Sequence, residues 1–455
     1  MIQADATGKH GVSLKSLTLG EDVGAKQKKA VYAVTVETLK YYTVLAGVVE
    51  GVKNNKSSSD TLLGRLSMPT ACVLARELLL SDGFSERFVG PAERIILDNE
   101  VALRAGLAAV VEARGGGNME LLLPRNAMMA AAGARKRTVR VNAPLVAGSV
   151  EEVLGALREE FGGAVCRNAY VGDVLELPAG SDLHAHRMVK DGRLVLQSLA
   201  SCMPAVALME GCPNSLVGAG GWTVVDACAA PGNKTTHVAS LMAQRYRGGG
   251  GGDDDNGGAY RVYAFDRDPV RLERLKGNVD KTQSGGIVTA MCADFLRVDP
   301  SVAPYDQVDA VLLDPSCSGS GTSGSRMDYL LPSAQEVAAR GVMYTDERVE
   351  QLSAFQVSAI LHAMSFPKVT RLVYSTCSVY VEENERVVAR VMAAGRAAGF
   401  ELVACIPTWP RRGMAVREDG DDGLSEADAA KVVRVDPLED GTDGFFVCAW
   451  ARGRV

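Results

Sequence analysis

Two patterns of apolar and polar positions divide this chain of 455 residues. From Lys26 to about Leu123, apolar residues recur at steps of three and four positions, which is the spacing of amphipathic helices. From about Gly221 onward, short apolar runs that end in a polar residue alternate with helix-like segments such as 346–364 and 383–399. Strands that alternate with helices form βαβ units around a mostly parallel sheet covered on both faces. The pattern therefore predicts a helical N-terminal part followed by a large α/β domain.

A smaller segment of mixed pattern lies between these two parts. Residues 135–142 (RKRTVRVN) combine basic and β-branched residues, which is the composition expected of an exposed basic strand. The segment 149–161 predicts a helix, and Ser149 and Glu152 have the spacing of a capping box at its start. The chain thus divides into four predicted segments: a flexible leader (1–25), a helical region (26–125), a small α+β module (126–215) and a large α/β domain (216–455).

Each predicted strand of the large domain ends in a side chain that can do chemistry. Ligands of an open parallel sheet bind at the carboxyl ends of its strands. We expect one crevice at this edge, lined by the residues at the strand tips: Asp226, Asp266, Asp294, Asp314 and Cys377. At the opposite rim, the glycine- and acid-rich run 245–258 indicates a flexible surface insertion.

The first of these strands ends in a turn of small residues, DACAAPGNKT (226–235), which opens a helix. Small residues let a backbone approach a ligand closely, and a helix N-terminus offers free N–H groups. The turn matches neither the dinucleotide fingerprint G-x-G-x-x-G nor the Walker loop, which disfavours pyrophosphate as a ligand. Asp266, at the next strand tip, is placed to accept hydrogen bonds from both ribose hydroxyls of a nucleoside. Together these features indicate S-adenosylmethionine as the cofactor.

Two cysteines stand in polar surroundings just past later strand tips. Cys317 follows Asp314 in LLDPSCSGSG, and Cys377 lies in STCS. A thiolate is a competent nucleophile, and methylation of C5 of a pyrimidine needs one, because C5 does not attack a sulfonium unaided. Addition of the thiolate to C6 activates C5, an acid supports the addition at N3 and the exocyclic amine, and a base later removes the C5 proton. The residues alone do not decide which of the two thiols is the nucleophile.

These motifs resemble those of the Nop/Sun-domain RNA cytosine-5 methyltransferases. The matching stretches are DACAAPGNKT, AFDRDPVRL, CADF, LLDPSCSGSG and YSTCSVYVEENERVV, in the order of the family and over about residues 195–450. The form DPSCSGSG, together with LQSLASCMPAVAL (196–208) and the N-terminal helices, is similar to the subgroup that modifies large-subunit ribosomal RNA. The resemblance implies that 216–455 is an α/β, Rossmann-like class I methyltransferase domain that uses S-adenosylmethionine. Its mostly parallel twisted sheet would follow a helical and a small α+β region that bind RNA.

The resemblance also implies catalytic roles. Cys377 would be the nucleophile, and Cys317 would help to release the product. Asp314 would contact both the methionine end of the cofactor and the target base.

At the cofactor, the resemblance places the turn and three further residues. Asp266 would hold the ribose hydroxyls, Arg271 would lie against the cofactor, and Asp294 would sit near the adenine. The residues of the turn would line the cofactor: Cys228, Ala229, Ala230, Pro231, Gly232, Asn233 and Lys234.

The net charge of −6 taken alone argues against a general nucleic-acid binder. Residues 418–443, however, hold ten acidic and two basic residues, so the acidity is local and a basic groove elsewhere remains compatible with the composition. RNA contacts are expected at basic residues nearer the N-terminus: Lys26, Lys28, Lys29, Arg125, Arg135, Lys136, Arg137 and Arg140. Attack on C6 requires that the target cytosine be unpaired or flipped out of its stack.

Other classes of protein fit the sequence poorly. Ten cysteines without a CxxC pair suit neither a disulfide scaffold nor a zinc ribbon, and HAH (184–186) lacks a partner cluster, so no metal is expected. Neither a secretory signal nor a membrane-spanning run is visible. We expect a monomer that works on pre-ribosomal particles, in the nucleus and its nucleolus if the cell is eukaryotic and in the cytoplasm otherwise.

Two alternatives stay open. The first is a non-catalytic, RNA-binding ribosome-assembly factor, against which the intact pair of thiols and all the acids count. The second is a Rossmann-like enzyme that acts on a small molecule or a protein, against which the long helical region with its basic stretch counts.

Overall fold

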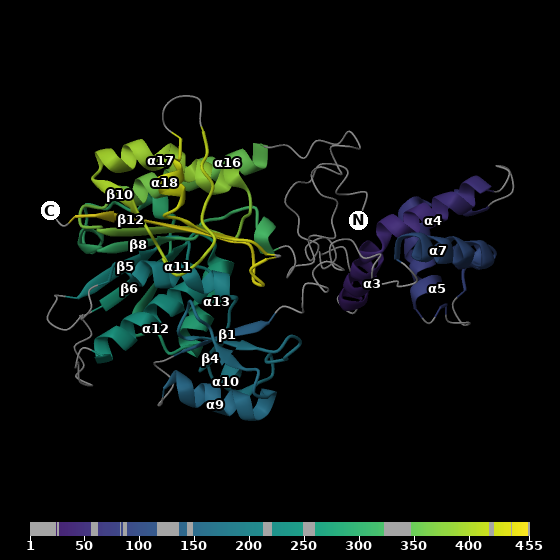
Figure 1. Cartoon of the computed structure of the whole chain (residues 1–455), viewed down its shortest axis with the longest axis horizontal. Helices are drawn as coiled ribbons and strands as arrows, with labels where there is room; N and C mark the ends of the chain where they lie inside the picture. The colour runs from purple at the N-terminus through teal and green to yellow at the C-terminus, as the bar shows by residue number, and fades with distance from the viewer. Residues whose placement is uncertain are drawn as a thin grey trace. The chain divides into compact units, whose positions relative to one another are not determined.

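The computed structural model shows two compact units, each of which is described by itself. One unit contains 1–134 and 323–344, and the other contains 135–322 and 345–455 (Figure 1). The structure describes these residues: 24, 27–55, 62–81, 83–84, 89–115, 136–142, 149–212, 221–248, 260–322, 347–417, 423–437 and 439–453. The predicted leader lies outside them apart from residue 24, as do most of the predicted insertion at 245–258 and part of the acidic segment 418–443.

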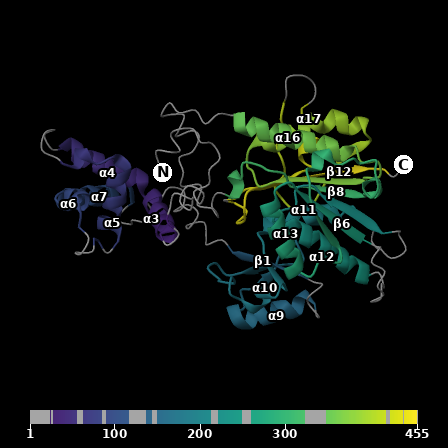
Figure 2. The same ribbon diagram turned by 180° about the vertical axis from the view of Figure 1, so that it is seen from behind.

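The first unit is helical, as the three- and four-residue spacing predicts. Its helices are α3 (Lys28–Lys40), α4 (Tyr42–Asn55), η1 (Leu62–Arg65), α5 (Met68–Leu80), α6 (Pro91–Leu97) and α7 (Glu100–Gly115). Two long periodic stretches each form two helices, α3 with α4 and α6 with α7 (Figure 2). At the break after α6, Asn99 donates from Nδ2 to the carbonyl of Ile95 at 2.8 Å. Fully buried apolar side chains, including Leu45, Leu63 and Ile96, hold these helices together.

A four-stranded antiparallel sheet begins the second unit, with the strand order β2-β3-β1-β4. Its strands are β1 (Arg137–Val141), β2 (Cys166–Arg167), β3 (Val174–Leu177) and β4 (Leu194–Leu196), and its helices are α9 (Val150–Phe161) and α10 (Arg187–Lys190). Two expectations are wrong here. The basic segment 135–142 is not an exposed strand, because β1 pairs on both sides and Arg140 is fully buried. Ser149 does occupy the N-cap of α9, but its side chain makes no capping hydrogen bond, so no capping box forms.

The large sheet has the order β10-β12-β9-β8-β5-β6-β7, and β11 pairs with β12 at its side. The pairs from β7 to β9 are parallel, whereas β12 runs antiparallel between β9 and β10. The strands are β5 (Trp222–Asp226), β6 (Tyr260–Asp266), β7 (Val288–Cys292), β8 (Ala310–Leu313), β9 (Arg371–Thr376), β10 (Phe400–Val403), β11 (Val433–Val435) and β12 (Phe445–Arg452). The predicted mostly parallel, Rossmann-like sheet is confirmed.

Helices cover both faces of this sheet (Figures 1 and 2). Because side chains of a strand alternate between faces, neighbouring residues of β5 enter different cores. Val224 packs with α11 (Leu199–Met209), α12 (Asn233–Gly248) and α13 (Pro269–Lys281), and Val225 packs with α16 (Glu347–Met364) and α17 (Glu385–Ala397). The remaining short helices are η5 (Phe295–Arg297), η6 (Tyr305–Gln307), η7 (Ser320–Thr322), η9 (Val381–Glu383) and α18 (Glu426–Ala429).

Candidate active site

A pocket of about 330 Å³ opens at the carboxyl ends of β5, β6 and β7, where the sequence predicts a ligand site. Its walls include the predicted residues Cys228, Asp266, Arg271 and Asp294. The sequence reasoning missed the part of the wall that comes from α16, because a helix position without a motif carries no visible signal. The other lining residues are Ala227, Arg267, Ala293, Phe295, Leu296, Ser316, Gln351, Leu352 and Phe355.

The carboxylate of Asp266 is fixed in the wall of this pocket. Its Oδ1 accepts from the backbone N–H of Asp268 at 3.0 Å, and its Oδ2 accepts from the N–H of Ala230 at 3.3 Å. The guanidinium of Arg271 lies 3.3 Å from Oδ2 and also donates to the carbonyl of Ala230 at 2.7 Å. Asp266 and Arg271 therefore fix the turn of small residues to the tip of β6.

The turn itself depends on small side chains. Gly232 has a φ of 103°, and a Cβ at this position would lie 3.3 Å from Cγ of Leu275, so α13 approaches the turn closely. Asn278 of the same helix donates to the carbonyl of Pro231 at 2.8 Å. Cys228 is one of the residues that line the pocket, and burial raises the pKa of its thiol well above the ordinary value, so the thiol remains a neutral packing group.

The acids at the tips of β5 and β7 differ in their surroundings. Asp294 lines the pocket and caps η5, accepting from the N–H of Leu296 at 3.1 Å. Asp226 is 1% exposed and accepts from the hydroxyl of Thr235 at 2.7 Å. Burial raises the pKa of Asp226 to about 7. The expectation that all five tip residues line one crevice is therefore wrong: Asp266 and Asp294 line the pocket, whereas Asp226 is buried and Asp314 and Cys377 lie outside the lining.

The two thiols predicted from the sequence meet. Sγ of Cys317 lies 3.3 Å from Sγ of Cys377. The hydrogen bond with Cys377, together with burial and nearby negative charge, raises the pKa of Cys317 well above its ordinary value. The thiol of Cys317 therefore holds its proton at neutral pH.

Asp314, at the tip of β8, forms an ion pair with Lys234, whose Nζ lies 2.6 Å from Oδ2. Its Oδ1 accepts from the hydroxyl of Ser375 at 2.8 Å. Burial lowers the pKa of Lys234, but attraction to Asp314 more than compensates, so the pKa lies above its ordinary value and the ammonium is charged. The side chain of Lys234, which the sequence reasoning placed at the cofactor, thus contacts the acid of the catalytic group.

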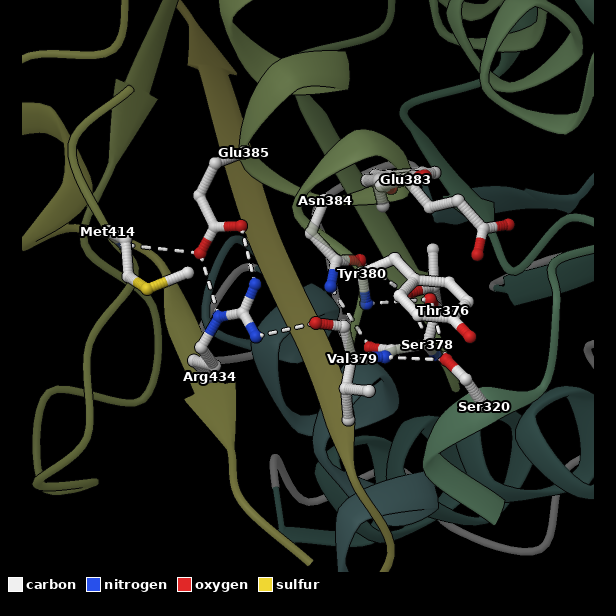
Figure 3. Close-up of polar contacts among 11 residues, drawn as sticks. Ser320, Thr376, Ser378, Val379, Tyr380, Glu383, Asn384, Glu385, Met414 and Arg434 are labelled. Carbon is white, nitrogen blue, oxygen red and sulfur yellow. Dashed lines mark hydrogen bonds and ion pairs between the residues drawn. The ribbon is translucent and has the colours of Figure 1, made fainter. Parts of the chain in front are cut away.

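A buried network holds the loop that follows Cys377 (Figure 3). Asn384 accepts from the hydroxyl of Thr376 at 2.6 Å and donates to the carbonyl of Ser378 at 3.0 Å. Glu385, whose side chain is fully buried, pairs with Arg434 through two bonds of 2.9 and 2.7 Å. Arg434 also donates to the carbonyl of Val379 at 2.9 Å. Sequence reasoning did not find Arg434, because no motif links it to a residue so distant in the chain.

The loop that carries Cys317 is tied to the same segment. The carboxylate of Glu383 accepts from the N–H of Ser318 at 2.9 Å and from Nε2 of Gln356 at 3.0 Å. Farther along this loop, a Cβ on Gly321 would lie 2.0 Å from the carbonyl oxygen of Gly444, so only glycine fits there. These contacts fix the positions of the loop that carries Cys317 and the loop that carries Cys377 relative to each other.

A family model described as 16S rRNA methyltransferase RsmB/F matches residues 216–451. The chain belongs to this family. It is 35% identical to the 25S rRNA (cytosine-C(5))-methyltransferase NSUN5 of Arabidopsis thaliana, over 99% of this chain and 71% of that relative. It is 33% identical to the 28S rRNA (cytosine-C(5))-methyltransferase of Mus musculus, over 97% of this chain and 88% of that relative. The crystal structure of PH0851 has a similar fold, with a TM-score of 0.61 and 21% identity over 97% of this chain and 98% of that one.

The basic residues that the sequence predicts as RNA contacts differ in their exposure. Of the predicted basic residues, Lys136 is exposed and pairs with Glu176 at 2.6 Å, and Arg137 lies 3.2 Å from Nε2 of His184. Arg140 is removed from this set, because its guanidinium is buried and bonds to Gln197. Three predicted residues and the side chain of a fourth lie outside the described residues: Lys26, Arg125, Arg135 and Lys29.

Two findings concern the kinds of site that the sequence disfavours. None of the described helices is long and apolar enough to cross a membrane. Within the described ranges, no three His, Cys, Asp or Glu side chains gather in a way that could hold a metal ion. His186 of the HAH segment instead caps α10 and lies 3.0 Å from Glu160.

Proposed function

We propose that this protein transfers a methyl group from S-adenosylmethionine to C5 of a cytosine in large-subunit ribosomal RNA. The observation that carries the proposal is the pair of thiols 3.3 Å apart, beside the carboxylate of Asp314. N- and O-methylation need no covalent activation of the base, whereas C5 methylation needs a thiolate. The relatives named for 25S and 28S rRNA are similar over 97% or more of this chain, beyond the part that the family model matches, and this supports the large subunit as the substrate.

The pocket has the hydrogen-bond acceptor and the apolar groups that an adenosine-containing cofactor requires. The buried carboxylate of Asp266 suits ribose hydroxyls, and Phe295, Leu296 and Phe355 provide apolar surface for a base. S-adenosylmethionine, when bound, supplies an electrophilic methyl group. Asp266, Arg271 and Asp294 are the residues of this chain that we expect to hold it.

The raised pKa of Cys317 supports Cys377 as the nucleophile. A thiol that keeps its proton donates a hydrogen bond to the neighbouring sulfur, and Cys377 is thereby free to add to C6 of the cytosine. The carboxylate of Asp314 would accept a hydrogen bond from the exocyclic amine of the base, and from N3 once the addition has protonated N3.

The same pair explains how Cys317 takes part in release. The negative charge of a Cys377 thiolate is one cause of the raised pKa of Cys317. Once Cys377 carries the base as a neutral thioether, that charge is gone and the pKa of Cys317 falls. Cys317 then releases its proton to solvent, and its thiolate accepts the C5 proton. The electrons of the C5–H bond form the C5–C6 double bond, and the bond between Cys377 and C6 breaks so that Cys377 leaves as a thiolate.

We further propose that the helical region (26–125) and the small module (126–215) present the RNA to the catalytic domain (216–455), with 1–25 as a flexible leader. In this proposal the protein is a monomer that acts on pre-ribosomal particles, in the nucleolus of a eukaryotic cell. The target cytosine is unpaired or flipped, because C6 is not accessible inside a stacked helix.

Bisulfite sequencing of total RNA tests the proposal. Cells that lack the protein should lose one or more 5-methylcytosines in large-subunit rRNA, and the unchanged chain should restore them. The Cys377→Ala chain should not restore them. A full set of marks in the deficient cells would overturn the proposed substrate and would favour a non-catalytic assembly factor.

A further inference from the structure

The ammonium of Lys234 is held from three sides. Besides the 2.6 Å ion pair with Asp314, its Nζ donates to the hydroxyl of Ser201 at 3.3 Å and lies 5.2 Å from the centre of the Phe445 ring. Ser201 belongs to α11, Phe445 to β12, and Asp314 follows β8. The position of Lys234 relative to Asp314 therefore depends on α11 as well as on the large sheet.

Ser201 is in turn held by Gln197, which lies between β4 and α11. The amide Nε2 of Gln197 donates to the backbone carbonyl of Ser201 at 2.9 Å and lies 3.5 Å from its hydroxyl oxygen. Gln197 is 5% exposed, so water competes little for these bonds. The first turn of α11 is thus fixed to Gln197, the residue that follows the last strand of the small sheet.

The other end of the Gln197 amide binds the central strand of the small sheet. Its Oε1 accepts from Nε of Arg140 at 2.9 Å, and Arg140 also donates to the hydroxyl of Thr236 at 3.1 Å. A buried guanidinium is costly unless its N–H groups find acceptors, so the bonds at Nε and Nη2 fix the guanidinium in place, while Nη1 has no hydrogen-bond partner among the described residues. Arg140, Gln197 and Ser201 form a continuous path of hydrogen bonds from β1 to the ammonium of Lys234.

We propose that Ser201 and Gln197 are positioning residues that hold the Lys234 ammonium against Asp314 in the orientation needed for base activation. The inference rests on the proposed transfer reaction. It adds to that reaction one residue of α11, Ser201, and one residue just before α11, Gln197. Neither residue lines the cofactor pocket, so their loss changes turnover and leaves cofactor affinity intact.

Four variants of the full chain test this inference, with steady-state kinetics on RNA, calorimetric cofactor binding and thermal melting as readouts. Ser201→Ala should lower kcat about 10-fold or more, because small misplacements of catalytic groups carry costs of this order. Ser201→Thr keeps the hydroxyl and should retain most of the turnover. The cofactor Kd should stay within about twofold of the wild-type value, and Ser365→Ala, an exposed serine at the end of α16, serves as the matched control.

Gln197→Glu separates positioning from mere stability. Its carboxylate still accepts from Arg140 but no longer donates to Ser201, so melting should be preserved while kcat falls as in Ser201→Ala. Wild-type kcat in both Ser201→Ala and Gln197→Glu would overturn the inference. The inference would also be overturned if the variants melted at so low a temperature that unfolding accounted for their lost activity, because the residues would then be structural only. A wild-type chain without any transfer would instead count against the proposed function.

Discussion

The sulfur atoms of Cys317 and Cys377 lie 3.3 Å apart although 60 residues separate the two cysteines along the chain. They meet because each follows one of two neighbouring parallel strands, β8 and β9, whose carboxyl ends share one edge of the sheet. Glu383 holds the loop of Cys317, and Asn384 holds the loop of Cys377. Two consecutive residues thus fix both thiols, and one pyrimidine ring is able to contact the pair.

Replacement of the nucleophile should abolish transfer without loss of the cofactor. In Cys377→Ala we expect methyl transfer to fall at least about 10³-fold, as is usual when a covalent nucleophile is removed. Cofactor binding, measured by calorimetry, should be unchanged, because Cys377 does not line the pocket. Cys166→Ala, a partly exposed free cysteine of the small sheet, is the control and should transfer at the wild-type rate.

The carboxylate of Asp266 should determine cofactor affinity. Asp266→Asn removes the charge that pairs with Arg271 and weakens the acceptor for ribose hydroxyls, so we expect Kd to rise about 10- to 100-fold, or about 1.4–2.8 kcal/mol. Isothermal titration of S-adenosylmethionine into the protein measures this change. Asp280→Asn, an exposed acid on the neighbouring α13, should bind normally. Equal affinities of Asp266→Asn and wild type would exclude Asp266 from the cofactor site.

The motif residues and the sheet could be predicted from the sequence, since each strand ends in a recognisable polar tip. Partners that come from distant segments could not. Arg434 completes the buried pair with Glu385, and Gln351 belongs to the pocket wall, yet both are ordinary helix or strand positions in the sequence. The prediction that Arg140 is exposed and contacts RNA was wrong. A mixture of basic and β-branched residues looks the same in an edge strand and in an inner strand whose arginine is buried and donates to Gln197 and Thr236.

The pair of Glu385 and Arg434 should contribute strongly to stability. Arg434→Met leaves the fully buried carboxylate of Glu385 without a cationic partner, with only the N–H of Met414 still bonded to it, and we expect the free energy of unfolding in urea to fall by about 3 kcal/mol or more. The double variant Glu385→Leu with Arg434→Met removes both charges and should recover part of this loss. If the single variant unfolds at the wild-type urea concentration, the pair does not fix the loop after Cys377.

Asp226 should make the folded chain less stable as the pH rises from about 4 to about 7. Burial raises its pKa to about 7. An unfolded chain releases this proton near pH 4, so the folded chain binds the proton more tightly, and stability falls as pH rises from about 4 to about 7. Asp226→Asn cannot ionise. Its stability relative to wild type should therefore increase between about pH 4 and about pH 7 and stay constant above that range, as followed by thermal melting. A difference that is constant from about pH 4 to about pH 7 would contradict the raised pKa.

The covalent adduct is the most direct test of the account. Cys317→Ala retains Cys377 but lacks the group proposed to release the product. Incubation of this variant with S-adenosylmethionine and a large-subunit rRNA fragment should yield a protein–RNA species that migrates slowly on a denaturing gel. The species should disappear in the double variant Cys317→Ala with Cys377→Ala. An adduct that persists in the double variant, or normal turnover by Cys317→Ala without any adduct, would contradict the central claim.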